Sequence, residues 1–355
     1  MNTIEVIREF SNANGAPGFE DEVLAVARRH APASLDIKED SLRNLYMRRR
    51  DNTGCNPVVQ LDAHSDEVGF MVQAIRPDGT LKFIPLGGWV ASNIPAHKVR
   101  VRTKDSSYIP GVTTAKPPHF MTEAERRQMP EVPQMSIDIG ASSDIQAREE
   151  FGVRIAEPVV PDVEFQYDEK HDLMIGKAFD CRLGCAAMLA TLDALEGQSL
   201  SVDVVGAMAA QEEMGTRGAT VTANAVKPDI AIVFEGCPAD DTVVQPYEIQ
   251  TAIRKGPMLR HIDAGMITNP RFQRFALDLA SELEIPCQES VRSGGSTNGR
   301  AIHLSNMGVP VIVIGLPVRY IHSHYGIASH EDLKNAVKLA VEIIRRLNRE
   351  VISRF

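Results

Sequence analysis

Residues 210–218, Ala-Gln-Glu-Glu-Met-Gly-Thr-Arg-Gly, constrain the fold of this chain more than any other stretch. The apolar residues 204–209 before them predict a short buried strand, and two glycines break the chain soon afterwards. Glu212 and Glu213 therefore lie at the carboxyl end of a strand, where open α/β sheets bind their ligands. Successive side chains of a strand point to opposite faces, so both carboxylates can serve one site only if the backbone turns there, as the glycines permit. The alternative is a pair of solvated glutamates on a loop.

Buried strands and amphipathic helices alternate over most of the chain. Further buried strands are predicted by apolar runs at residues 58–61, 229–234 and 309–316. Helices are predicted by their periodicity and end signals at residues 3–10, 20–30, 185–195, 270–283 and 329–347. This alternation is typical of an α/β fold in which helices pack on a largely parallel sheet.

The segment between residues 68 and 172 has a different pattern. Asp78-Gly79 between two apolar runs predicts a hairpin turn. Residues 97–102 and 135–139 alternate polar and apolar side chains, as half-buried strands do. We therefore predict an all-β domain inserted into an α/β domain. The predicted division is residues 1–67 and 173–355 for the α/β catalytic domain and residues 68–172 for the insertion.

The composition is that of a globular protein and argues against several classes of function. Hydrophobic residues make up 43% of the 355 residues and charged residues 24%, and the formal net charge of −9 argues against binding to nucleic acid or anionic membranes. No stretch approaches the roughly 18 apolar residues of a membrane-spanning helix, and the N-terminus is acidic where a signal peptide is basic and then apolar. We therefore expect a cytoplasmic protein. The five cysteines are odd in number and lack a Cys-x-x-Cys spacing, so we expect buried thiols.

Histidine and carboxylate side chains recur where the predicted strands and helices meet. They are His64, Asp66, Asp180, Glu212, Glu213, Glu235 and His322. Two histidines with several carboxylates suit two divalent ions of the zinc, cobalt or manganese type. Two such ions about 3.5–4 Å apart can activate a water and stabilise a tetrahedral intermediate. One carboxylate must stay off the metals to take the proton of that water, and two adjacent glutamates offer this division of labour.

Taken one at a time, these residues have structural interpretations as well. Asp180 precedes a predicted helix and could cap its N-terminus. His64 could be a surface residue or a hydrogen-bonded core residue, as lone histidines usually are. The metal-site hypothesis therefore depends on the whole set rather than on any member.

Together, five separated motifs resemble those of a known family, the tetrahedral (TET) di-metal aminopeptidases. This family includes glutamyl and deblocking aminopeptidases and members called endoglucanase M. The resemblance covers nearly the whole chain. The motifs are Ala63-His-Ser-Asp-Glu-Val-Gly69, Lys177-Ala-Phe-Asp-Cys-Arg-Leu-Gly184, Gln211-Glu-Glu-Met-Gly-Thr-Arg-Gly218, Val233-Phe-Glu235 and Arg319-Tyr-Ile-His-Ser323.

The resemblance implies that five of these residues hold two divalent metal ions in each subunit, with zinc or cobalt expected and manganese as a further candidate. By the resemblance, Asp180 bridges the two ions. His64 and Glu235 complete one site, and Glu213 and His322 complete the other.

The resemblance also implies the reaction and the architecture. Glu212 is the implied general base, and Asp66 supports His64. The implied reaction releases N-terminal residues from peptide substrates. The implied fold is a phosphorylase/hydrolase-like three-layer α/β catalytic domain with an inserted small β-barrel domain that mediates assembly. Family members form dimers that associate into hollow tetrahedral dodecamers, so we expect a large homo-oligomer.

Three positions depart from the usual family pattern. Glu235 stands where the family usually has Asp, so a longer arm carries that carboxylate. Cys181 follows Asp180 where Asn is common. Asn298 ends Gly-Ser-Thr-Asn where Gly-Gly-Thr-Asp is usual, which removes a carboxylate. None of these changes deletes an implied ligand.

Two alternatives belong to other classes of function. In an endoglucanase, Glu212 and Glu213 would be an acid and a nucleophile, but glycosidase carboxyls flank a sugar bond about 5–10 Å apart, which neighbouring residues rarely achieve. That interpretation also leaves both histidines of the motifs without a role. A non-catalytic, metal-stabilised assembly protein is the other alternative, and the intact base at position 212 argues against it.

Some further residues are weaker candidates. Arg254, Lys255 and Arg260 could attract an acidic substrate side chain, although solvated surface charges have the same pattern. Most other histidines are expected to be structural or surface residues. His324 is a candidate neighbour of His322.

Overall fold

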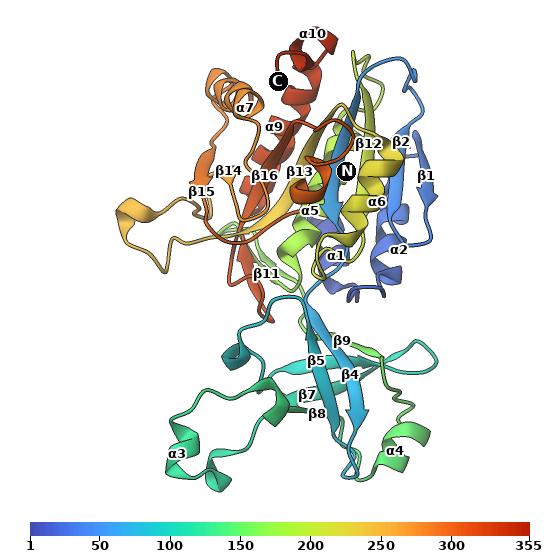
Figure 1. The fold of residues 1–355 in the computed structure, drawn as a ribbon, viewed down its shortest axis with the longest axis vertical. Coiled ribbons are helices and arrows are strands. Elements are labelled where there is room, and N and C mark those ends of the chain that lie inside the picture. The colour runs from blue at the N-terminus through green and yellow to red at the C-terminus, as the bar shows by residue number, and fades with distance from the viewer.

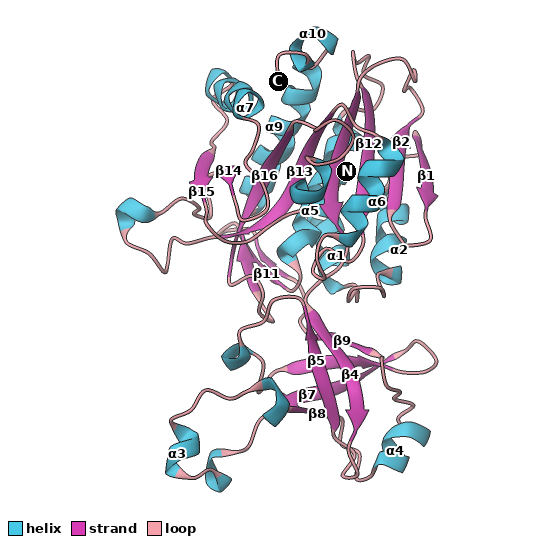
Figure 2. Cartoon of the chain, viewed as in Figure 1, coloured by secondary structure: helices cyan, strands magenta, loops and turns pink.

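The computed structural model describes residues 1–355 and consists of a large sheet covered by helices and a small closed β-barrel (Figures 1 and 2). The eleven strands of the sheet are β1 (Leu35–Glu39), β2 (Leu45–Arg49), β3 (Val58–His64), β10 (Gln166–Asp168), β11 (Leu173–Gly176), β12 (Asp203–Ala209), β13 (Ile230–Pro238), β14 (Met258–Ile262), β15 (Gln288–Val291), β16 (Val311–Arg319) and β17 (Gly326–Ala328). They follow the order β1-β2-β12-β3-β13-β16-β17-β11-β10, with β14 paired to β16 and β15 to β14.

The four central strands, β12, β3, β13 and β16, are parallel and almost wholly buried. All seven residues of β12 are buried, as are eight of the nine residues in each of β13 and β16. Continuous apolar runs are typical of parallel strands that helices cover on both faces. The predicted buried strands are therefore confirmed. Because the strands are parallel, their carboxyl ends meet at one edge of the sheet.

Helices cover both faces of the sheet. They are α1 (Thr3–Asn12), α2 (Asp21–His30), α5 (Phe179–Ala194), α6 (Arg217–Val226), α7 (Pro270–Glu282), α8 (Gly299–Ile302), α9 (His330–Arg346) and α10 (Arg349–Ile352), with a 3-10 turn η4 (Pro246–Glu248). Side chains of α1, α2, α5, α7 and α9 join one core of 51 buried residues, and those of α6 and α8 join a smaller core on the other face. Along β13, Phe234 enters the first core and Val233 the second. The predicted three-layer organisation is confirmed.

The ends of several helices and strands can be compared with the end signals in the sequence. The side chain of Asn269 accepts hydrogen bonds from two backbone N–H groups at the start of α7, and Ser329 caps α9. Both caps agree with the sequence. The strand predicted at residues 229–234 was expected to end at Glu235, which is wrong because β13 continues to Pro238. Among the cysteines, Cys55 is exposed rather than buried.

The second unit is a closed six-stranded antiparallel barrel with its own core of 13 buried residues. Its strands are β4 (Gly69–Ile75), β5 (Leu81–Leu86), β6 (Lys98–Arg102), β7 (Tyr108–Thr114), β8 (Ser136–Asp138) and β9 (Pro158–Pro161), in the order β4-β5-β8-β7-β6-β9. Its short helical segments are η1 (Ala91–Asn93), η2 (Pro118–Phe120), α3 (Glu123–Arg126), η3 (Val132–Gln134) and α4 (Asp144–Glu149). The predicted inserted β-barrel is confirmed.

The insertion lies at the carboxyl edge of the central strands, because β3 ends at His64 and β4 begins at Gly69 (Figure 1). The last barrel strand ends at Pro161, and β10 already pairs with β11 in the large sheet. The predicted insertion extended to residue 172. The division into domains stays a prediction, and the strand pairing favours an end soon after Pro161.

No helix of the protein combines the length and the apolar character that crossing a membrane requires.

Candidate metal centre

Strand ends and the first turn of α5 bring the predicted polar residues together. β12 pairs with β3 so that Ala209 lies opposite His64, and the turn with the two adjacent glutamates starts beside that histidine. Glu235 reaches the same edge from within β13, which flanks β3 on its other side. Asp180 comes from the start of α5, and His322 from the loop after β16. The sheet order therefore gathers residues from five separate segments.

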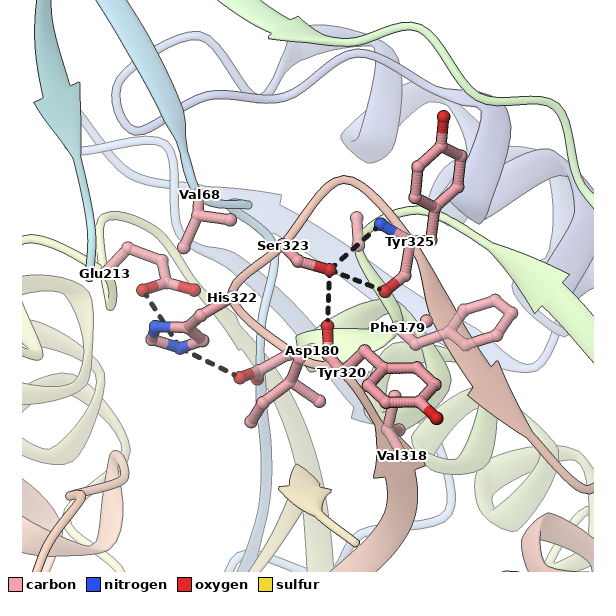
Figure 3. A pocket seen from close by; sticks show the side chains of 12 residues that line it. Val68, Phe179, Asp180, Glu213, Val318, Tyr320, His322, Ser323 and Tyr325 are labelled. Carbon is pink, nitrogen blue, oxygen red and sulfur yellow. Dashed lines mark hydrogen bonds and ion pairs between the residues drawn. The ribbon is translucent and has the colours of Figure 1, made fainter. Parts of the chain in front are cut away.

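Asp180 lies between two groups of candidate ligands. Its Oδ1 is 3.0 Å from Nε2 of His64, and its Oδ2 is 3.4 Å from Nε2 of His322. Glu235 completes the first group, with Oε1 3.3 Å from Nε2 of His64. Glu213 completes the second, with Oε2 3.7 Å from Nε2 of His322 (Figure 3). Within each group the ligand atoms lie within 4.8 Å of one another.

The alternative role of Asp180 as a helix cap does not hold. Its backbone is not helical, with φ −87° and ψ 105°, and α5 has no side-chain hydrogen bond at its N-cap. The carboxylate faces the two imidazoles instead. The first turn of α5 thus presents a side chain to the site rather than closing the helix end.

Asp66 holds the turn that carries the two glutamates. Its Oδ1 accepts a hydrogen bond from the backbone N–H of Glu212 at 2.8 Å, and its Oδ2 accepts one from that of Glu213 at 3.0 Å. Oδ1 also lies 3.3 Å from Nδ1 of His64. The chain turns immediately before, at Gln211, whose φ is 55°. The predicted turn is therefore present, and Asp66 both fixes it and orients the histidine.

The carboxylates of the cluster are buried, and the two imidazoles beside them do not supply enough positive charge to balance theirs. Burial raises the pKa of Glu212 and of Glu213 to about 8, and it raises that of Glu235 well above its ordinary value. Hydrogen bonds from the two imidazoles outweigh burial at Asp180 and lower its pKa. Oε1 of Glu213 and Oε2 of Glu235 are buried and have no hydrogen-bond partner. Because buried carboxylates need a counter-charge, two imidazoles with these oxygens fit divalent cations.

The three departures from the family pattern occupy different places. Glu235 reaches the first group despite its longer arm. Cys181 lies beside that group, but its Sγ donates a hydrogen bond to the carbonyl of Phe234 at 3.1 Å, and burial raises the pKa of the thiol. Asn298 lies behind the group and donates to Oδ1 of Asp62 at 2.7 Å, where an aspartate would face a second carboxylate.

A cavity of about 470 Å³ opens beside the cluster. It is lined by Asp180, Glu212, Glu235 and His322 of the cluster and also by Arg260, Arg292 and residues 293–296.

Of the three basic residues considered from the sequence, only one reaches the cavity. Arg260 is buried in its wall and pairs with Asp263 at 3.0 Å. Arg254 and Lys255 are exposed and do not line the cavity. The sequence reasoning missed Arg292, which follows a short strand without any motif of its own.

Two further contacts were missed. The carbonyl of Gly88, in the barrel, accepts a hydrogen bond from Nδ1 of His322 at 2.8 Å. Glu67 forms a buried ion group with Lys177 and Arg182 behind the cluster. A backbone carbonyl leaves no signal in a sequence, whereas Glu67 and Lys177 lie inside two of the motifs and could have been considered.

Comparison with known proteins places the chain in a family. The model of the M42 glutamyl aminopeptidase family matches residues 44–339, and the glutamyl aminopeptidase of Lactococcus lactis subsp. cremoris (strain MG1363) is 31% identical over 99% of both chains. The chain belongs to the M42 glutamyl aminopeptidase family. The protein is therefore a metallopeptidase of the aminopeptidase type, and the resemblance found in the sequence is confirmed.

Solved structures support the same assignment. A TET aminopeptidase from Thaumarchaeota archaeon SCGC AB-539-E09 is 36% identical, with a TM-score of 0.93 and 99% of each chain covered. The TET1 peptidase of Pyrococcus horikoshii, which can assemble into a tetrahedron or a large octahedral shell, is 25% identical. Its TM-score is 0.87, over 98% of this chain and 100% of that chain. The M42 fold with its insertion therefore extends over the whole chain.

Proposed function

We propose that the protein releases single residues from the free N-terminus of peptides, with two divalent metal ions held by His64, Asp180, Glu213, Glu235 and His322. The observation that carries this proposal is the position of Asp180 between two pairs of one histidine and one glutamate. When bound, the ions supply Lewis acidity that polarises the scissile carbonyl and lowers the pKa of an attacking water. Zinc or cobalt is proposed first and manganese second, because imidazole and carboxylate ligands suit all three.

Glu212 is the proposed general base. Its carboxylate lies within 4.8 Å of the ligand atoms of His64 and Glu213 but belongs to neither group that shares Asp180. The carboxylate can take a proton from the attacking water and pass it to the leaving amine.

The charge of the site favours a free α-amine. Five carboxylates surround the centre and exceed the four positive charges of two divalent ions by one. An ammonium group is attracted to such a site where water is scarce, whereas a C-terminal carboxylate is repelled. The cavity of about 470 Å³ beside the cluster has room for the side chain of the N-terminal residue.

The reaction is tested with a peptide of mixed sequence and its N-acetylated twin. Products are followed by mass over time. We expect a ladder of products shortened one residue at a time from the free N-terminus and none from the acetylated peptide. Internal cuts, trimming from the C-terminus, or cleavage of cellulose oligomers alone would contradict the proposal.

Two variants separate the roles of the adjacent glutamates. Glu212→Gln should keep both ions and lose on the order of 10²–10⁴ in turnover, because only proton transfer is removed. Glu213→Gln should lose metal as well, since a ligand is weakened. Glu289→Gln, on the exposed pair with His261, is the control and should match the wild type. Equal metal loss in the first two variants would reverse the assignment.

We also propose that the barrel mediates a closed homo-oligomer, with a tetrahedral dodecamer as the form suggested by the dodecamer and the tetrahedron described for the TET1 peptidase. Large apolar side chains that are exposed on the insertion support the proposal. They are Ile84, Val90, Val112, Phe120, Met129, Ile145 and Ile155. The α/β domain exposes large apolar side chains as well, among them Tyr247 and Met307, so the choice of the barrel as the contact unit is the part of the proposal that the variants below test.

Assembly is tested by sedimentation of the intact protein and of two variants matched in exposure. Phe120 in the insertion and Ile267 in the α/β domain are both 73% exposed. We expect a species well above a dimer for the wild type and for Ile267→Asp, and a smaller species for Phe120→Asp. A wild type that sediments only as a monomer at micromolar concentration would refute the proposal.

A further inference from the structure

We infer that the turn formed by Gly87 and Gly88 of the inserted barrel is part of the active site, where it positions His322 against Asp180 and Glu213. The turn follows β5 and lies 234 residues before His322 in the chain. This inference rests on the proposed metal centre, because it assigns a positioning role beside two of the proposed ligands. It adds a role in the site to the role in assembly proposed for the insertion.

The carbonyl of Gly88 selects which nitrogen of His322 is free. A carbonyl oxygen can only accept a hydrogen bond, so the contact of 2.8 Å requires that Nδ1 carries the proton. In the neutral ring that a metal would bind, Nε2 is then the unprotonated nitrogen. Nε2 is the atom that faces Asp180 at 3.4 Å and Glu213 at 3.7 Å. The barrel thus presents this ring to the second group in the form that binds a metal.

The turn also fills the space beside both proposed ligands. A Cβ at Gly88 would lie 2.9 Å from Nδ1 of His322. A Cβ at Gly87 would lie 2.8 Å from Oε2 of Glu213 and 2.7 Å from Val68, whose side chain is close to the same group (Figure 3). Side chains at these two positions would therefore displace the ligands themselves.

Aromatic contacts hold the turn against the loop that carries His322. Trp89 follows the turn, and its ring stacks on Phe70 with centroids 4.7 Å apart. The Trp89 ring lies 5.0 Å from that of His324, which in turn stacks on His97 of the barrel at 4.1 Å. Because the ring of His324 is buried between barrel side chains, the barrel and the loop are fixed to each other two residues from His322.

The test measures metal binding directly. Full-length protein is stripped with a chelator and titrated with Co²⁺ and with Zn²⁺ against a competing chelator, and the Co²⁺ absorption spectrum reports the ligand geometry. In Gly88→Ala we expect one of the two ions to bind about 10–100-fold more weakly, while the other keeps its wild-type affinity. The cobalt spectrum of the weakened site should change as well.

A matched pair of variants controls for backbone strain. Gly87 and Gly140 are both barrel glycines with left-handed backbones, at φ +79° and +81°. A Cβ at Gly140 would meet nothing within 4 Å, unlike one at Gly87. Both alanine variants carry the same conformational cost, so only Gly87→Ala should weaken metal binding.

The outcomes separate this inference from the proposed function. Wild-type affinity at both sites in Gly87→Ala and Gly88→Ala would overturn the inference and leave the metal centre intact. A wild type that binds fewer than two ions would overturn the centre and the inference with it. If Gly88→Ala does not fold, Trp89→Leu decides, because it loosens the turn without adding an atom beside the ligands. Weaker binding of one ion supports the inference, and unchanged binding of both refutes it.

Discussion

The buried ion group behind the metal centre permits a quantitative test of what holds the site in place. Nζ of Lys177 donates hydrogen bonds to both carboxylate oxygens of Glu67, at 2.6 and 2.8 Å, and to the carbonyl of Ala13 at 2.9 Å. Both side chains are at most 1% exposed. Glu67 follows Asp66, and Lys177 lies three residues before Asp180. The pair therefore joins the two segments that carry these residues.

Lys177→Met removes the closer of the two cations beside the buried carboxylate of Glu67. Glu67 then keeps only Arg182 at 3.3 Å and the backbone N–H of Gly15 at 3.1 Å. Burial lowers the pKa of Lys177 to about 8 even beside Glu67, so the intact pair contributes little net stability. Removing one partner of a buried pair costs about 3–5 kcal/mol when the remaining charge is uncompensated, and because Arg182 stays beside Glu67 we expect Lys177→Met to cost about 3 kcal/mol, the lower end of this range. The double variant with Glu67→Gln should cost less than the sum of the two single variants, with a coupling of about 1–3 kcal/mol.

Urea unfolding of chelator-stripped protein measures these costs with two probes. Far-UV circular dichroism follows the helices of the α/β domain, and Trp89, the single tryptophan, reports on the barrel. Lys338→Met removes an exposed lysine of α9 and should stay within about 0.5 kcal/mol of the wild type. A cost below about 1 kcal/mol for Lys177→Met, or additive costs in the double variant, would refute the reasoning.

Three further predictions concern the metal, a buried carboxyl and a close contact. Chelation should abolish peptidase activity, and zinc or cobalt should restore it; a fully active preparation shown by elemental analysis to be metal-free would contradict this. Asp332 accepts hydrogen bonds from the N–H groups of Arg254 and Gly256, and burial raises its pKa to about 6. Between pH 4 and 6 the folded state then keeps a proton that the unfolded state loses. The unfolding free energy of the wild type should therefore fall by about 3 kcal/mol relative to that of Asp332→Asn over this range and stay level above pH 6. Urea unfolding of both proteins at each pH measures this difference. A Cβ at Gly218 would lie 2.3 Å from the carbonyl oxygen of Ala210, so Gly218→Ala should lose about 1–3 kcal/mol in the same assay, and no loss would show that the turn yields freely.

The features that could be predicted from the sequence are those with a local cause. The central strands are apolar throughout because helices cover both faces, and that pattern is visible without a structure. The caps at Asn269 and Ser329 use the nearest backbone N–H groups. The chemistry of the ligand set was also visible, because the motifs combine histidines with carboxylates, which are ligand types that divalent ions such as zinc take. That these residues act as ligands and base stays a prediction.

The features that could not be predicted depend on partners far along the chain. The short strands β17, β11 and β10 are neighbours at one end of the sheet order, and no local sequence pattern predicts them. Glu235 was placed at a strand end because the apolar run stops at residue 234, but pairing with β16 continues β13 past that point. Likewise, Asn298 has a defined role only because Asp62 lies across from it, 236 residues away. Such positions are set by tertiary contacts that override local preference.

The backbone around the two adjacent glutamates is fixed by hydrogen bonds, and this determines where each side chain lies. Their chemistry is identical, so the proposed division into base and ligand must come from position. Gln211 turns the chain in the left-handed region, and Oε1 of Glu20 accepts a hydrogen bond from its N–H at 3.2 Å. Asp66 then binds one N–H of each glutamate with a different carboxylate oxygen. Two carboxylates from elsewhere in the chain thus fix three consecutive amides, and this backbone constraint would allow the two neighbouring side chains to take the different roles proposed for them.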